Sequence, residues 1–88
     1  MNKTAVAQQV TDFLKSVTAD ESLAPTTSLI EAGVVDSLTM MDLVSFIEGE
    51  FHFRLGVEDF TPVNFASAET VAELIERSVA TNAAHNAA

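Results

Sequence analysis

The chain has 88 residues, 48% of them hydrophobic, and its 13 acidic residues outnumber four basic ones, giving a formal net charge of −9. This predicts one small domain with a buried core and argues against a nucleic-acid binder, which needs a basic patch. The absence of cysteine excludes disulfides, thiolate zinc sites and a cysteine nucleophile, and no apolar run reaches the length of a membrane span.

The N-terminal third of the chain predicts one helix and a long loop. The apolar residues that recur at helical spacing, and should form the buried stripe of the helix, are Val6, Val10, Phe13, Leu14 and Val17. The loop that follows is long enough to need anchors in the core, and we expect Leu23, Leu29 and Ile30 to provide them. Gly33 is expected to take a positive φ and turn the chain toward the next helix.

The middle of the chain predicts a second helix that begins at Asp36 or Ser37 and ends near Phe51. Its core-facing residues are Met40, Leu43, Val44, Ile47 and Phe51. Residues 51–56 alternate apolar and polar side chains, as a short strand does, but no second strand is available for pairing. We therefore expect an extended connector that buries Phe53 and Leu55, followed by a single helical turn.

The C-terminal part predicts a last helix, capped by Ser67 and with Glu69 in its first turn. Its buried stripe comprises Val71, Leu74, Ile75 and Val79. Residues 81–88 have nothing to bury and are expected to be a disordered tail, so the domain covers residues 1–80. The expected fold class is all-α, a small four-helix bundle with three main helices, one short helix and a long first loop.

Side chains alone do not form a catalytic site in this sequence. The only histidines are His52, in the connector, and His85, in the tail. No glycine-flanked nucleophile turn is present, and the acids do not follow the ligand spacing of a calcium loop. We therefore expect neither a catalytic residue nor a resident metal ion.

Ser37 has two possible roles. A serine between Asp36 and Leu38 at the start of a helix is in most proteins only a cap for the free amides. Here the hydroxyl lies at the mouth of a long loop, where an enzyme could reach it, and a phosphate attached to it would meet the positive end of the helix dipole. Leu38 is also expected to point away from the buried stripe, where a bundle normally places a polar residue.

The stretch LIEAGVVDSL, residues 29–38, opens a helix in a small acidic domain and closely resembles the acyl and peptidyl carrier proteins. The similarity extends from Val6 to about Val79. It implies that Ser37 receives a covalent 4′-phosphopantetheine arm, which a phosphopantetheinyl transferase moves from coenzyme A with the help of magnesium. The thiol of the arm would hold acyl or aminoacyl groups as thioesters, and the protein would have no catalytic activity of its own.

The resemblance also implies partners and a setting. A loading enzyme would attach the acyl or aminoacyl group, and a downstream synthase or transferase would remove it. We expect a monomer in the cytoplasm, without membrane insertion. Residues 1–10 also lack the hydrophobic stretch of a signal peptide. The length of the chain suggests a free-standing carrier.

The subfamily is less sharply indicated. Residues 34–36 depart from the Gly-Gly-His-Ser or Gly-Gly-Asp-Ser core common in nonribosomal peptide carriers, and the second helix has fewer acids than is usual in fatty-acid carriers. Residues 33–38 and 58–67 look more like carriers of one unusual building block in polyketide, nonribosomal peptide or related specialised pathways. Alternatives are a fatty-acid carrier or, in a different class, an acidic helical adaptor or inhibitor without covalent cargo. A small hydrolase lacks a base near Ser37.

The second helix also predicts a face for partner enzymes. Leu38 and Met41 would form an apolar patch, although Met41 could equally be peripheral packing. Asp36, Asp42 and Glu48 would rim this patch and steer basic partners toward it. Asp36 could also orient the magnesium ion or the transferase before transfer.

Overall fold

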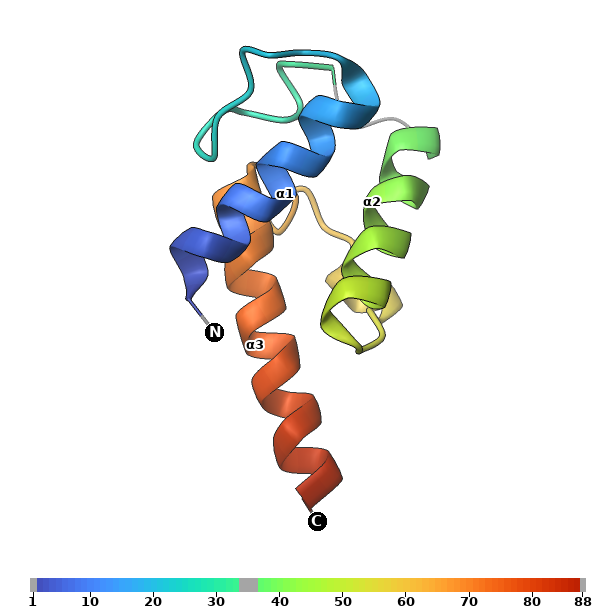
Figure 1. Cartoon of the computed structure of the whole chain (residues 1–88). Coiled ribbons are helices and arrows are strands. Elements are labelled where there is room, and N and C mark those ends of the chain that lie inside the picture. The colour runs from blue at the N-terminus through green and yellow to red at the C-terminus, as the bar shows by residue number, and fades with distance from the viewer. Residues whose placement is uncertain (1, 34–36, 88) are drawn as a thin grey trace.

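The computed structural model describes residues 2–33 and 37–87. For Ser37, Val57 and residues 81–87 it describes the backbone but not the side chains. Its elements are α1 (Lys3–Thr18), α2 (Ser37–Phe51), the 3-10 turn η1 (Val57–Asp59) and α3 (Ala68–Ala87). No strand occurs in the described residues, so the all-α prediction is confirmed, and the short fourth element is a single 3-10 turn. In Figure 1, α1 crosses the upper part of α3, α2 stands beside them, and the end of α3 projects beyond the rest.

One hydrophobic core holds the three helices and the first loop together. Its buried apolar residues are Val6, Ala7, Val10, Leu14, Leu23, Leu29, Leu43, Ile47, Phe53, Phe65, Ala68, Val71, Ala72, Leu74 and Ile75. Helix α1 packs chiefly against α3 and more lightly against α2. Among the described residues, each buried side-chain nitrogen or oxygen atom has a hydrogen-bond partner.

Helix α1 begins at a clear cap, because the Asn2 side chain accepts hydrogen bonds from the amides of the first turn, including that of Thr4 at 2.8 Å. The predicted core residues Val6, Val10 and Leu14 are buried, and Phe13 is half-buried. The prediction for Val17 is wrong, because its side chain is exposed. Helical spacing gives the direction of a side chain, but not how far the neighbouring elements extend along the helix.

The burial of Thr11 was not expected from the sequence. This side chain lies in the core beside Ala7, and its hydroxyl donates a hydrogen bond to the Ala7 carbonyl oxygen at 2.8 Å. A threonine can be buried in this way because its one donor is satisfied within the helix itself.

The first loop is anchored in the core by Leu23 and Leu29, as predicted, but not by Ile30, which is exposed. The Leu29 amide donates to the Ala66 carbonyl oxygen at 2.9 Å. This bond fixes the loop against the segment before α3 with Leu29 turned inward, and its chain neighbour Ile30 faces outward. The predicted positive φ of Gly33 is confirmed at +72°.

Helix α2 buries Leu43 and Ile47 completely, whereas the predicted core residues Met40, Val44 and Phe51 are only half-buried. The sequence prediction missed Phe46. Its ring stacks on that of Phe13 in α1, with centroids 4.4 Å apart and an interplanar angle of 14°. It also meets the Phe51 ring edge-on at 6.5 Å. These three rings close the contact between α1 and α2 beside the core.

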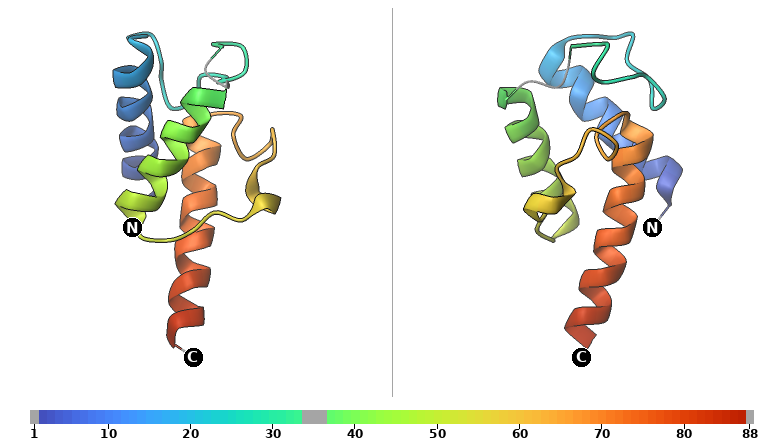
Figure 2. Two further views of the ribbon diagram at one scale, coloured as in Figure 1. Left: turned by 90° about the vertical axis from the view of Figure 1, so that its right-hand side faces the viewer. Right: turned by 180° about the vertical axis from the view of Figure 1, so that it is seen from behind.

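The connector after α2 follows the prediction, with Phe53 buried and Leu55 half-buried. Two acidic side chains hold it in place. Glu48 of α2 accepts a hydrogen bond from the Leu55 amide at 2.9 Å, and Asp59 of η1 accepts one from the Gly56 amide at 2.9 Å. These bonds tie the connector both to the helix before it and to the turn after it. Figure 2 shows the connector running from the end of α2 to η1.

Helix α3 begins with the predicted cap. The Ser67 hydroxyl accepts a hydrogen bond from the Thr70 amide at 3.3 Å, and the Thr70 hydroxyl accepts one from the Ser67 amide at 3.0 Å. The helix continues to Ala87, beyond residue 80, the predicted end of the domain. Alanine-rich sequence without glycine or proline favours this continuation. A disordered tail at 81–88 and a domain boundary at residue 80 stay predictions. No helix in the described part of the chain is long and apolar enough to cross a membrane.

Candidate attachment site at the start of the second helix

Ser37 is the first residue of α2, which confirms the predicted start of this helix. Asp36, the other candidate at this position, lies outside the described residues. The first turn of α2 contains no acidic residue. A phosphate attached to Ser37 would therefore lie at the positive end of the helix dipole, with no carboxylate from that turn opposing it. The local structure fits a phosphodiester at this serine.

The exposed face of α2 carries apolar side chains next to this helix start. Leu38 is 76% exposed, as the sequence predicted, and Met41, for which peripheral packing was an equal alternative, is 68% exposed. Asp42 is exposed beside them. The core side of the same helix is occupied by Leu43, which is 1% exposed, and by Ile47. Leu38 and Met41 therefore contribute little to the core, and their surface is available to another molecule.

The sequence predicted Glu48 as an exposed acid at the rim of the partner face, and the structure differs from this prediction. The Glu48 side chain is half-buried, and one carboxylate oxygen is bound to the amide of Leu55. This residue has a structural role within the chain whatever its role toward partners. The sequence offered no signal for this bond, because it joins residues that only the folded connector brings together.

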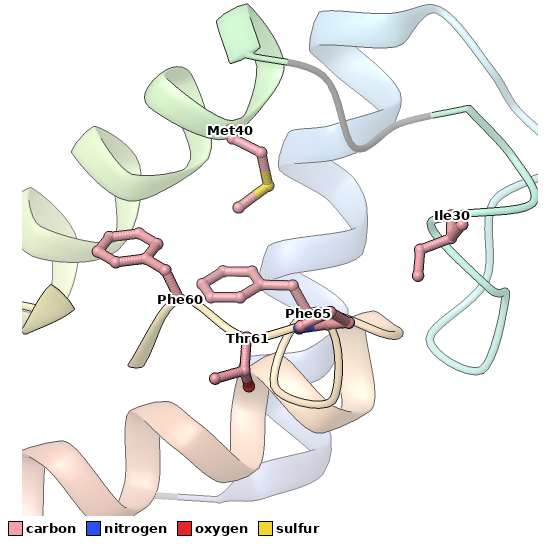
Figure 3. Close-up of a pocket in the computed structure, with 6 residues that line it drawn as sticks. Ile30, Met40, Phe60, Thr61 and Phe65 are labelled. Carbon is pink, nitrogen blue, oxygen red and sulfur yellow. The ribbon is translucent and has the colours of Figure 1, made fainter. Parts of the chain in front are cut away.

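An apolar groove lies beside the first turns of α2. It has a volume of about 240 Å³ and is lined by Ile30, Met40, Phe60, Thr61, Pro62 and Phe65. Figure 3 shows Met40 reaching from α2 toward the rings of Phe60 and Phe65. These two rings are stacked, with centroids 5.8 Å apart and an interplanar angle of 3°. Met40 follows Ser37 by about one helical turn, so the groove opens close to the predicted attachment site.

His52 lies too far from Ser37 to assist it as a hydrolytic nucleophile. His52 follows the last residue of α2, about 22 Å along the helix axis from Ser37 at 1.5 Å per residue. Its backbone takes a left-handed conformation, with φ +58°, and its side chain is exposed. The described side chains also contain no cluster of three histidine or acidic residues that could hold a metal ion.

A serine at the start of a helix, in a small acidic helical domain with an apolar groove beside it, fits the class of carrier domains. The family model described as the phosphopantetheine attachment site matches residues 5–77 of the chain, and the chain belongs to this family. Proteins of this family carry a covalent 4′-phosphopantetheine group. The chain is accordingly an acyl or aminoacyl carrier protein, and the alternative of an adaptor without covalent cargo is not supported.

Two curated relatives agree with this assignment. The chain is 33% identical over 57 residues to the probable acyl carrier protein PigG of Serratia sp. (strain ATCC 39006). The aligned region covers 65% of this chain and 66% of that protein. It is 29% identical over 76 residues to aminoacyl carrier protein 1 of Bradyrhizobium diazoefficiens. This aligned region covers 82% of this chain and 83% of that protein.

Solved structures of carrier proteins have the same fold. One neighbour is from a complex of the Bradyrhizobium japonicum glycine:[carrier protein] ligase with glycylated carrier protein. Its TM-score is 0.64 at 27% identity, covering 83% of this chain and 96% of that chain. A second is from the same ligase with its cognate carrier protein and an analogue of glycyl adenylate. Its TM-score is 0.65 at 29% identity, covering 90% and 96% of the two chains.

Proposed function

We propose that the hydroxyl of Ser37 is the attachment point of 4′-phosphopantetheine. The observation that carries the proposal is the start of α2 at this serine, within the matched residues 5–77 and with an acid-free first turn. A phosphopantetheinyl transferase, assisted by magnesium, would transfer the phosphopantetheine of coenzyme A to the Ser37 oxygen, which loses its proton, with adenosine 3′,5′-bisphosphate as the leaving product. The helix dipole then stabilises the charge of the phosphodiester.

The cargo would be an acyl or aminoacyl group bound as a thioester to the thiol of the arm. The chain has no cysteine, so the reactive sulfur comes from the prosthetic group. The protein itself supplies no catalytic group, and it acts in the cytoplasm as a monomeric carrier in a specialised pathway. The names of its relatives, an acyl carrier and an aminoacyl carrier, support this range of cargo.

The proposed partners are the transferase, a loading enzyme and a downstream synthase or transferase. An enzyme that couples an amino acid to the arm is the best-supported loading enzyme, because the structural neighbours are carrier proteins bound to a glycine:[carrier protein] ligase. The net charge of −9 would draw these enzymes in through basic surfaces.

The partner face centres on the exposed side chains of Leu38 and Met41. Asp36, Asp42 and Glu48 supply negative charge around it, with one oxygen of Glu48 also engaged by the connector. Interfaces of this kind combine an apolar centre with a charged rim that guides the encounter. Asp36 has the additional proposed role of orienting the magnesium ion or the transferase before transfer.

Intact-mass measurement tests the attachment site directly. The parent protein, incubated with coenzyme A, magnesium and a broad-specificity transferase, should gain the mass of one phosphopantetheine, and Ser37→Ala should gain none. Ser67→Ala is the matched control, because Ser67 is also a serine at the start of a helix. Modification of Ser37→Ala, or loss of modification in Ser67→Ala with the fold intact, would contradict the assignment.

A further inference from the structure

The side chains that a mild oxidant attacks are few in this protein, and two of them lie together near the start of α2. The sequence contains three methionines and no cysteine, tryptophan or tyrosine. One methionine is Met1, and the other two, Met40 and Met41, are neighbours in α2. They lie about 4.5 and 6 Å from Ser37 along the helix axis, at 1.5 Å per residue. Among the described residues, both thioether sulfurs are therefore close to the proposed attachment site.

The two neighbouring methionines have different surroundings. Met41 is 68% exposed, on the same face of α2 as Leu38. Met40 is half-buried and packs against the hydrophobic core. Figure 3 shows the Met40 side chain directed toward the rings of Phe60 and Phe65. An oxidant must reach the sulfur atom to react with it, so susceptibility follows exposure. Met41 is therefore expected to be oxidised before Met40.

The reaction considered is the oxidation of the Met41 thioether by hydrogen peroxide. A lone pair of the sulfur attacks one peroxide oxygen, a new S–O bond forms and the O–O bond breaks. The proton on the transferred oxygen passes to the departing hydroxide, which leaves as water. The sulfur is oxidised by two electrons and the peroxide is reduced by two. The product is methionine sulfoxide, in which a polar S–O group replaces an apolar thioether.

This change alters the surface of α2 without disturbing the core. Leu38 and Met41 form the exposed apolar patch of this face, and of the two only Met41 can be oxidised. A sulfoxide covered by an apolar partner surface would lose its hydrogen bonds to water, which costs free energy unless the partner supplies a donor. The sulfoxide oxygen also adds partial negative charge beside the exposed Asp42. Oxidation of Met41 is therefore expected to weaken binding at this face while the fold stays intact.

We propose that Met41 is a redox-sensitive modification site, which peroxide converts to the sulfoxide ahead of Met40, and that this conversion slows the attachment of phosphopantetheine at Ser37. The effect on attachment rests on the proposed function of Ser37. The order of oxidation is independent of that function, because it depends only on the exposure of the two sulfurs. Methionine sulfoxide reductases, one for each sulfoxide epimer, would restore the apolar side chain.

Oxidation of the protein before phosphopantetheine is attached tests both parts, because the thiol of the arm is then absent. The protein is treated with hydrogen peroxide, and catalase removes the excess before the transferase is added. Fragmentation mass spectrometry distinguishes the two adjacent residues, and Met41 should accumulate sulfoxide several-fold faster than Met40. Protein with the sulfoxide at Met41 should be modified with a kcat/KM about fivefold below that of untreated protein, the scale of one interface residue. The treated and untreated proteins should melt together.

Two leucine variants are the matched controls, and each is compared with its own untreated form. Met41→Leu keeps an apolar side chain of similar size without a sulfur, so peroxide should leave its kcat/KM unchanged. Met40→Leu keeps Met41 and should lose about fivefold on oxidation, as the parent does. Both methionine sulfoxide reductases together should return the oxidised parent to its untreated rate.

Three results would overturn the proposal. Equal rates of oxidation at Met40 and Met41 would refute the selectivity. An unchanged kcat/KM after oxidation of Met41 would refute the effect on attachment. A loss of the same size in peroxide-treated Met41→Leu would place the sensitive group elsewhere in the chain. An untreated parent that gains no phosphopantetheine, or a modified Ser37→Ala, would instead refute the attachment site itself.

Discussion

Two leucines on α2 separate the contribution of the helix to stability from its contribution to partner binding. Leu43 is 1% exposed, and Leu43→Ala removes three carbon atoms from a close-packed core. Such substitutions cost about 2.7–5 kcal/mol, because the cavity closes only in part. A chain of 88 residues has a stability of about 4–13 kcal/mol at the usual value per residue. The melting temperature should therefore fall by more than about 10 °C, at about 4–8 °C per kcal/mol.

Leu38 is 76% exposed, so only about a quarter of its surface is removed from water on folding. Full burial of a leucine contributes about 1.5–3 kcal/mol, which gives about 0.4–0.7 kcal/mol here. Leu38→Ala should melt within a few degrees of the parent yet be modified by the transferase about tenfold more slowly. Circular dichroism melts and intact-mass time courses on both variants measure the two effects. Equal destabilisation by the two substitutions, or parent-rate modification of Leu38→Ala, would refute the assignment of the two faces.

Substitutions at three further positions test individual contacts. Ser67→Ala removes the acceptor for the Thr70 amide and should cost about 1 kcal/mol in urea unfolding; an unchanged midpoint would show that the cap contributes nothing. Glu48→Gln keeps an oxygen for the Leu55 amide and should be less destabilising than Glu48→Ala, which should cost about 1 kcal/mol; the reverse order of the two midpoints would exclude a structural role for this bond. His52→Gly should raise the melting temperature, because a left-handed backbone costs a non-glycine residue about 1–2 kcal/mol; a lower melting temperature would mean that the histidine side chain compensates for this strain.

The sequence predicted the order of the elements because local chemistry determines where they begin and end. The second helix begins at Ser37 and ends at Phe51, and the turn at Gly33 has the expected positive φ. The cap at Ser67 was also predicted, since it depends on residues within one turn. In each case the interacting groups are close in the sequence.

The errors arose where burial depends on distant parts of the chain. Ile30 has the composition of a core residue, but the bond from the Leu29 amide to Ala66 leaves it outside. Phe46 packs on the ring of Phe13 across two helices, which helical spacing on α2 alone does not indicate. The role of Ser37 could not be decided by spacing either. A cap and an attachment site require the same position, and attachment was favoured by the long loop before Ser37, by the outward-pointing Leu38 and by the family resemblance.

Asp36 raises an electrostatic question, because a carboxylate next to a phosphodiester opposes the modified form of the protein. The first turn of α2 has no acid, and Asp42 lies about 7.5 Å from Ser37 along the axis, near the Debye length of about 8 Å at physiological salt. We therefore propose that the acid at position 36 acts chiefly before transfer, by orienting magnesium. Asp36→Asn should slow modification, most strongly at low magnesium, while the melting temperature changes little. Equal kcat/KM for Asp36→Asn and the parent across a magnesium titration would remove this role.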